Sequence, residues 1–505
     1  MNRHVKLLSV GVRGLDADLI QVEVVAKDQL GPFQLQGLPE SRERETRVRV
    51  RAALQQVGLD LDERAVTVTL HPPELAKNAV VDLAVAVAIL VVLGRVPVEA
   101  VNGSIFLGEL SLTGALRPVR GVLPMLRGAT ALDIRRAVVP RGNAHEAAQV
   151  AGIEVLVADH LAEVLRHLQA GAVLEGAGTP PPFKPQAEPG SPDLAEIRGQ
   201  VEAQRALEIA AAGEHSLLLI GPFGSESIQL ARRLPTILPP LSIEEAIEVT
   251  SMASVAGLLK SDQGFIFSRP FRAPHHTVSA AGLLGGGDPI RPGEVSLAHH
   301  GVLFLDHVMD LRSTHLEGLR RILDARQAVI CRGQQRLTFP AKTLLVGAVA
   351  PCPCGYFDSS NPTCSCSPDR LHAYRVRLRG SIFQDFDLRL NISPVEITQP
   401  HQPQFPGESS KSVRDRVVQA KQRQSERTRS SKIKDTTRLE PEELKESVAL
   451  DAIGAKVLAE TAAFFQLSAE DCARILRMAR TIADLDGSEM VRSSHINEAG
   501  NFYLP

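Results

Sequence analysis

Residues 216–241 read SLLLIGPFGSESIQLARRLPTILPPL, and their order predicts a buried strand, a tight turn and a helix. The apolar run at 216–220 has the length and composition of a strand that is covered on both faces. Gly221 and Gly224 permit the tight turn that follows. A strand, a glycine-bearing turn and a helix in this order form the arrangement of a phosphate-binding loop in an α/β sheet.

Two further apolar runs, GVLFLD at 301–306 and KTLLVGAVA at 342–350, predict strands of the same kind. Three buried strands that alternate with helices indicate a parallel sheet, whose ligand edge lies at the carboxyl ends of the strands. The turn after residue 220, Asp306 and Ala350 all fall at those ends. The sequence therefore predicts a nucleotide-type site at one edge of this sheet.

The chain has 505 residues, with 44% hydrophobic and 23% charged residues, which is typical of a globular protein of two to four domains. Its net charge of −2 provides no global basic field, so a contact with nucleic acid must be local. The most apolar run, at 83–94, is too short to span a bilayer. No targeting signal is apparent, and we expect a cytoplasmic protein.

A proline-rich linker at 173–192 separates an α/β domain at 1–172 from the sheet domain at 193–400. In the first domain, residues 5–12, 19–27 and 65–72 predict strands, and 44–58 and 82–94 predict helices. Residues 193–213 predict one amphipathic helix that starts near Asp193. The region at 401–505 is helical by pattern, including 455–465 and 468–485.

Several long motifs closely resemble the ComM/YifB family, whose members are magnesium-chelatase-like AAA+ proteins. The motifs are GLPE at 37–40, GELSLTGALRPVRG at 108–121, GPFGSESIQLARRLPTILPPL at 221–241, RPFRAPHHTVSAAGLLGGG at 269–287, RPGEVSLAHHGVLFLD at 291–306, APCPCGY at 350–356 and ARILRMARTIADLDGSE at 473–489. The resemblance implies a Lon-protease-like (S5 domain 2-like) α/β N-terminal domain, an AAA+ core with a Cys-rich insertion at 352–366 and a helical lid. It also implies a hexameric ring that acts as an ATP-driven helicase on branched DNA during natural transformation, with ATP and Mg²⁺ as cofactors.

The phosphate loop departs from the family pattern at the residues that touch the nucleotide. Gly221, Pro222, Gly224 and Ser225 match the family, but Glu226 replaces a glycine, Ser227 replaces the lysine and Ile228 replaces the Mg²⁺-binding hydroxyl. A carboxylate about 4 Å from one phosphate charge costs roughly 4 kcal/mol at an effective dielectric near 20. The loop has therefore lost its attraction for a triphosphate.

The other positions that serve ATP hydrolysis in the family also depart from the family pattern. Asp306 keeps the acidic position that supports Mg²⁺, whereas His307 stands where the family has the glutamate that activates water. The family's water-orienting asparagine corresponds to Ala350, and two arginines that contact nucleotide correspond to Asp385 and Glu470, with Arg474 one turn further on. Catalysis of phosphoryl transfer is nearly all positioning and electrostatics, so these changes together favour a hydrolysis-dead pseudo-ATPase.

Two functions follow as hypotheses. In the first, the chain is a non-catalytic scaffold or regulatory subunit that forms a ring with itself or with an active AAA+ paralogue. The alternative is a divergent active helicase or remodelling factor that uses Asp306, His307 and substitute cations. Peptidase activity is excluded, because the segments that match the Lon-like domain offer no Ser-Lys pair: residues 65–102 contain no serine and 79–182 no lysine.

Four cysteines and a basic stretch remain. Cys352, Cys354, Cys364 and Cys366 form two pairs that predict either a structural Cys₄ zinc site or free thiols.

Residues 411–434 contain nine Lys or Arg residues and two acids. Their side chains, Arg423, Arg427 and Arg429 among them, would contact either DNA phosphates or the acidic surface of a neighbouring subunit. His275 and His276 belong to a family loop and are expected to be structural or partner-facing.

Overall fold

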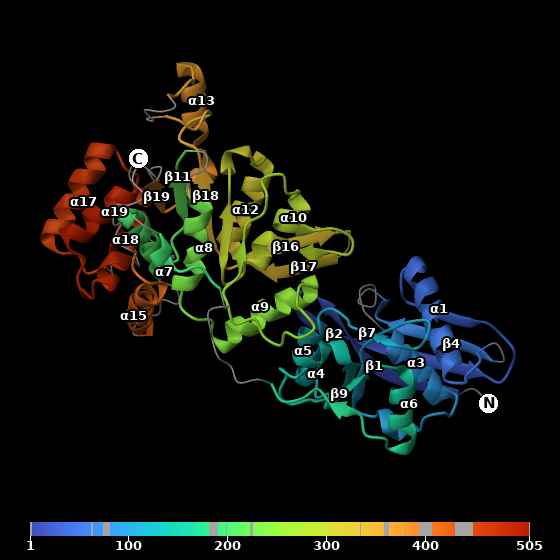
Figure 1. Ribbon diagram of the computed structural model, residues 1–505. Coiled ribbons are helices and arrows are strands. Elements are labelled where there is room, and N and C mark those ends of the chain that lie inside the picture. The colour runs from blue at the N-terminus through green and yellow to red at the C-terminus, as the bar shows by residue number, and fades with distance from the viewer. Residues whose placement is uncertain are drawn as a thin grey trace.

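The computed structural model describes residues 3–61, 64–73, 81–180, 190–197, 199–222, 226–333, 335–357, 363–378, 380–392, 407–429 and 448–503. The chain forms an N-terminal α/β domain, a central sheet domain and a group of C-terminal helices that packs on the sheet domain (Figure 1). Within these ranges, no helix combines the length and the apolar character needed to cross a membrane.

The N-terminal domain begins with a four-stranded sheet in the order β1-β2-β4-β3. Its strands are β1 (Arg3–Arg13), β2 (Asp16–Lys27), β3 (Phe33–Gln36) and β4 (Ala65–His71). β1, β2 and β4 pair antiparallel, whereas β3 pairs with β4 in parallel. The strands predicted at 5–12, 19–27 and 65–72 are therefore confirmed.

A second sheet in this domain has the order β10-β9-β8-β5. Its strands are β5 (Ser104–Phe106), β8 (Arg136–Pro140), β9 (Glu154–Ala158) and β10 (Glu175–Gly176), and β6 (Glu109–Leu110) and β7 (Leu116–Arg117) form a separate hairpin. The helices are α1 (Glu40–Gln56), α3 (Asp82–Val92), α4 (Val122–Ala131), α5 (Ala144–Ala147) and α6 (Leu161–Ala170). The mixed sheets and helices confirm an α/β domain.

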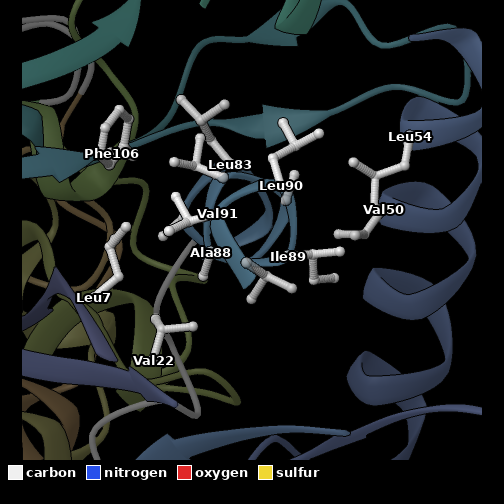
Figure 2. Packing of buried hydrophobic residues seen from close by; sticks show 14 of the residues in the cluster. Leu7, Val22, Val50, Leu54, Leu83, Ala88, Ile89, Leu90, Val91 and Phe106 are labelled. Carbon is white, nitrogen blue, oxygen red and sulfur yellow. The ribbon is translucent and has the colours of Figure 1, made fainter. Parts of the chain in front are cut away.

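Helix α3 is the centre of this domain, because all of its residues are buried. Figure 2 shows Leu83, Ile89 and Leu90 of α3 surrounded by side chains from α1 and from the strands. A helix that is apolar on all sides can be stable in water only when other elements cover it completely. This explains why the most apolar run of the sequence forms a short core helix.

The central domain contains a five-stranded parallel sheet in the order β12-β15-β18-β11-β19. Its strands are β11 (Leu217–Ile220), β12 (Phe271–Arg272), β15 (Val302–Leu305), β18 (Leu344–Val349) and β19 (Leu388–Asn391). Successive residues of β11 and β15 point into different cores: Leu217 and Leu219 pack on one face, and Leu218 on the other. Because both faces are covered, these strands read as continuous apolar runs.

The helices of this domain are α7 (Val201–Gly213), α8 (Ser227–Ile237), α9 (Ile243–Ala256), α10 (Ala280–Leu284), α11 (Glu294–Leu297), α12 (Ser313–Ala325), α13 (Pro368–Leu378) and α14 (Ser381–Gln384). Two hairpins project from it, β13 (Gly285–Gly286) with β14 (Arg291–Pro292), and β16 (Gln327–Arg332) with β17 (Gln335–Pro340). The C-terminal helices are α15 (Ser410–Arg429), α17 (Ala452–Phe465), α18 (Ala469–Leu485) and α19 (Ser493–Tyr503). They share one hydrophobic core with α7, α8 and one face of the sheet.

The single helix predicted over 193–213 is wrong in its first third. Residues Leu194–Glu196 form a short 3-10 turn, which the side chain of Asp193 caps by accepting from the backbone N–H of Ala195. Gly199 has φ +70°, so the chain turns there and α7 begins only at Val201.

The N-terminal domain contacts the central domain through α9. Ser254 of α9 accepts a hydrogen bond from the backbone N–H of Gly121 at 2.9 Å and donates one to the buried carboxylate of Glu146. Glu146 also accepts from the backbone N–H of Leu123, at the start of α4. Nearby, Leu15 from the β1–β2 turn packs with hydrophobic residues of the β16–β17 hairpin. The two domains are therefore joined by a buried polar contact and an apolar one.

Candidate nucleotide site

The ends of β11, β15 and β18 meet at one edge of the central sheet, as the sequence predicts. The backbone N–H of Gly221 donates to the carbonyl of Val349 at 3.0 Å, which ties the start of the loop to the end of β18. Pro222 follows, whereas Gly224 and Ser225 lie outside the described residues. The end of β11 therefore lies beside the end of β18, at the position where the sequence predicts the phosphate loop to begin.

Helix α8 begins directly after the loop, with Glu226 at its N-cap. The side chain of Glu226 makes no capping hydrogen bond, and the residue is exposed. Ser227 is buried, and Ile228 packs against the hydrophobic core below the sheet. The first turn of α8 therefore offers one carboxylate and no cation to a phosphate.

Asp306 and His307 follow β15 at the same edge. The backbone N–H of His307 donates to Oδ1 of Asp306 at 2.9 Å, and His307 has a left-handed backbone with φ 49°. The imidazole Nε2 lies 3.8 Å from the Asp306 carboxylate and its Nδ1 lies 4.0 Å from that of Asp310. Asp306 is one potential Mg²⁺ ligand, but Ile228 provides no oxygen to complete the site.

The histidine pair His275 and His276 lies beside this edge. The His276 and His307 rings are 6.1 Å apart, and the His275 and His276 rings are 4.0 Å apart. Sequence reasoning gave these histidines no part in the nucleotide edge, because 30 residues separate them from His307. Only the pairing of β12 with β15 brings the two segments together.

Ala350 follows β18, and its methyl group cannot orient a water molecule. Its carbonyl accepts a hydrogen bond from the hydroxyl of Tyr374 at 2.7 Å, which anchors α13 to this edge. Burial raises the pKa of Tyr374 to about 12, so the hydroxyl remains a donor at neutral pH. A cavity of about 370 Å³ lies between α13 and the edge and is lined by His307, Asp310, Ala350, Arg370, Tyr374 and Arg377 among others.

Asp385 and Glu470 lie near the opposite ends of the strands, where β11 begins. Asp385 is two residues before Asp387, which binds the backbone N–H of Ser216 at the start of β11. Both Asp385 and Glu470 line a cavity of about 990 Å³ between the sheet domain and α18. The structure therefore brings these two acids together and separates them from the loop residues of the same chain.

Arginines of the same chain already engage both acids. Asp385 lies 2.8 Å from Nε of Arg320 and 3.7 Å from Arg474, and Glu470 lies 3.4 Å from Arg474 and 3.5 Å from Arg477. Burial raises the pKa of Asp385, and the two arginines oppose this effect. Glu470 also occupies the first turn of α18, where a negative charge favours the helix dipole.

The four cysteines of the insertion converge on one point. The Sγ atoms of Cys352, Cys354, Cys364 and Cys366 all lie within 4.8 Å of one another, and none forms a disulfide. Cys354 lies 3.3 Å from Cys352 and 3.5 Å from Cys364. Zn–S bonds of about 2.3 Å in a tetrahedron place the sulfurs roughly 3.8 Å apart, so this donor set fits zinc. A hydrogen bond from the backbone of Tyr356 lowers the pKa of Cys354 to about 6, whereas the pKa values of Cys364 and Cys366 are raised.

Glu248, His299 and His300 form a second cluster with metal-ligand spacing, which sequence reasoning missed. Nδ1 of His299 accepts from the backbone N–H of Lys342 at 3.0 Å, so the proton of the neutral ring is on Nε2. This Nε2 lies 2.8 Å from Glu248 and donates to it. Burial and the neighbouring His300 lower the pKa of His299 to about 4. Glu248, His299 and His300 therefore form a hydrogen-bond network.

The basic residues of α15 contact this chain's own helix α18. Nη1 of Arg423 donates to the carbonyl of Asp484 at 2.6 Å, and Arg427 forms a bidentate pair with the buried Asp484 carboxylate at 2.9 and 2.6 Å. Both arginines therefore contact this chain's own α18. The side chain of Arg429, the last residue of α15, lies outside the described residues.

In the N-terminal domain, Asp82 is the first residue of the buried helix α3. Its buried carboxylate accepts from Nε of Arg49 at 2.7 Å and from the backbone N–H of Leu110 at 3.1 Å. Asp82 and Arg49 therefore form a buried structural ion pair.

A parallel sheet in which β11 leads through Gly221 toward helix α8, joined to C-terminal helices, is the arrangement of a magnesium-chelatase-like protein of the AAA+ type. Three family models match the chain. The model described as magnesium chelatase, subunit ChlI, matches residues 193–399. The model of subunit ChlI of Mg-chelatase matches residues 22–143, and the model of the ChlI C-terminal part matches residues 407–502.

The particular family follows from the similar proteins, and the chain belongs to the ComM/YifB family. It is 36% identical to the uncharacterised protein YifB of Salmonella typhimurium, over 97% of this chain and 95% of that protein. It is also 36% identical to an uncharacterised protein of Mycobacterium tuberculosis, over 95% of each chain. The competence protein ComM of Haemophilus influenzae is 34% identical, over 96% of this chain and 94% of its own length.

Proposed function

We propose that this chain is a ComM/YifB-type protein that has lost ATP hydrolysis and acts as a scaffold or regulatory subunit of a DNA-associated AAA+ ring. The observation that carries the proposal is the start of α8, where Glu226 and the buried Ser227 replace the cradle glycine and the lysine. The replacement of the catalytic glutamate by His307 and of the asparagine by Ala350 supports it.

The proposal extends to the other parts of the chain. The N-terminal domain has a Lon-like fold that serves assembly, because Asp82 and Arg49 form an ion pair where a peptidase dyad would stand. The four cysteines hold a structural zinc ion. Four protein ligands leave no open position for a reacting water, so this metal supports the insertion and takes no part in chemistry.

The partner in the ring is another AAA+ subunit, either a second copy or an active relative. One relative of this chain is named as a competence protein, and we propose the handling of DNA as the setting for the ring. Assembly does not require nucleotide in this proposal, since Asp385 and Glu470 are already paired with Arg320, Arg474 and Arg477.

A calorimetric titration of the purified chain with ATP and Mg²⁺ tests the proposal. We expect no saturable binding in the micromolar range, and an oligomeric state that is the same with and without nucleotide. Saturable, Mg²⁺-dependent micromolar binding would favour the alternative of an active, divergent motor.

A further inference from the structure

Helix α13 is an exposed basic element beside the candidate nucleotide site. None of its residues is buried, and its sequence, PDRLHAYRVRL, contains three arginines, one histidine and one acid. The acid, Asp369, lies in the first turn, where it favours the helix dipole. In Figure 1, α13 projects beyond the ends of the strands and is far from α15.

The inner side of α13 is fixed to the protein. Tyr374 donates to the carbonyl of Ala350 at 2.7 Å, and Nη2 of Arg377 donates to the carbonyl of Met309 at 2.7 Å. The four-cysteine cluster directly precedes the helix. Two side-chain hydrogen bonds therefore anchor the helix to the end of β18 and to the segment after β15.

Arg370 and Arg375 are exposed cations of this projection, and Arg370 also lines the cavity beside His307. They are five residues apart, which places them about 140° apart around a helix of 3.6 residues per turn. The guanidinium carbon of Arg375 lies 4.6 Å from the centre of the Phe357 ring, a contact that orients the side chain without neutralising it. The major groove of DNA admits one α-helix, and a phosphate strand lies on each side of the groove. Cations on two sides of one helix can therefore each contact one of these strands.

We propose that α13, rather than α15, is the element that docks on double-stranded DNA, through phosphate contacts by Arg370 and Arg375. This inference rests on the DNA association included in the proposed function. The contrast with α15 supports it, because Arg423 and Arg427 of α15 are already bound to Asp484. Phosphate contacts carry no base information, so the predicted binding is independent of sequence and sensitive to salt.

The test is fluorescence anisotropy of a labelled DNA duplex titrated with the full chain at several salt concentrations. The double variant Arg370→Gln and Arg375→Gln is compared with Arg44→Gln and Arg47→Gln, which removes the same charge from exposed positions on α1. We expect the α13 variant to lose about tenfold or more in affinity and its salt slope to fall by about 2, because each phosphate contact contributes about 0.9. The α1 variant keeps both values.

Three other outcomes would overturn the inference. Wild-type protein that binds no duplex would remove it together with the proposed DNA association. If the α13 variant binds the duplex as tightly as wild-type protein, α13 is not the docking element, but the proposed DNA association is retained. Equal losses in both variants would show a response to total charge, without a specific docking element. Thermal melts of both variants establish that any loss occurs in folded protein.

Discussion

At the scale of single residues, the affinity for a triphosphate depends on the charge of a few side chains. A phosphate loop binds through backbone amides, one lysine and a metal ligand, and this chain replaces the last two with Ser227 and Ile228 while adding Glu226. The structure places these residues at the start of α8, where Ser227 is buried and Ile228 packs on the core. The Ile228 side chain therefore contributes to packing.

Restoring the loop should restore binding without restoring hydrolysis. In the triple variant Glu226→Gly, Ser227→Lys and Ile228→Thr, the added cation and the removed carboxylate each contribute roughly 4 kcal/mol toward one phosphate charge. Calorimetry should then detect Mg²⁺-ATP binding, whereas phosphate release stays at background because His307 and Ala350 remain. The single variant Glu226→Gln is the control and should not bind. Wild-type protein that binds as tightly as the triple variant would contradict this prediction.

The buried His299 predicts a dependence of stability on pH. Because its pKa falls to about 4 in the folded protein, against about 6.5 when unfolded, protonation favours the unfolded chain. Stability should therefore fall as the pH is lowered from 6.5 to 4, by at most about 3 kcal/mol, and this contribution should change no further below pH 4. Chemical denaturation over this range should show the loss in wild-type protein and in the exposed control His372→Gln. The variant His299→Gln should lack it, and an identical pH profile in all three proteins would refute the assignment.

At the scale of elements, the sequence predicts most of the helices and strands. It predicts fewer of the contacts between them. The strands β11, β15 and β18 follow from their apolar runs, and α3 follows from its length and composition. The helix predicted from residue 193 starts late because the backbone of Gly199 turns, which its sequence context did not reveal. The pairs Arg427–Asp484 and Arg320–Asp385 join segments 57 and 65 residues apart, so only the packed helices reveal them.

The cysteine insertion predicts about one zinc ion per chain in protein purified under reducing conditions. The variant Cys354→Ser should lose the metal, because it removes a sulfur that lies within 3.5 Å of two others. Cys472→Ser, on α18, is the control and should keep it. Metal analysis by mass spectrometry measures both, and wild-type protein free of zinc would show that the thiols stay free.

At the scale of the whole molecule, one buried serine joins the N-terminal domain to the sheet domain. Ser254 accepts from Gly121 and donates to Glu146, which in turn accepts from Leu123 at the start of α4. Burial raises the pKa of Glu146, opposed by its three donors. No sequence pattern marks this contact, since its partners lie 108 and 133 residues from Ser254.

The variant Ser254→Ala should weaken the attachment of the two domains. It leaves the buried N–H of Gly121 without its partner, at a cost of about 1–3 kcal/mol. We expect a lower melting temperature and a larger radius of gyration in small-angle X-ray scattering. Ser251→Ala is a matched control on the same helix, because its buried hydroxyl makes no hydrogen bond within the described residues and its loss should cost little. Equal effects of the two substitutions would show that Ser254 does not join the domains.

The most direct test of the central claim is steady-state release of inorganic phosphate from ATP and Mg²⁺ by the purified chain. The account predicts a rate equal to background, unchanged by Asp306→Asn, because neither the loop nor the strand ends bind a triphosphate productively. Metal-stimulated turnover that Asp306→Asn abolishes would contradict it, and the chain would then be an active motor.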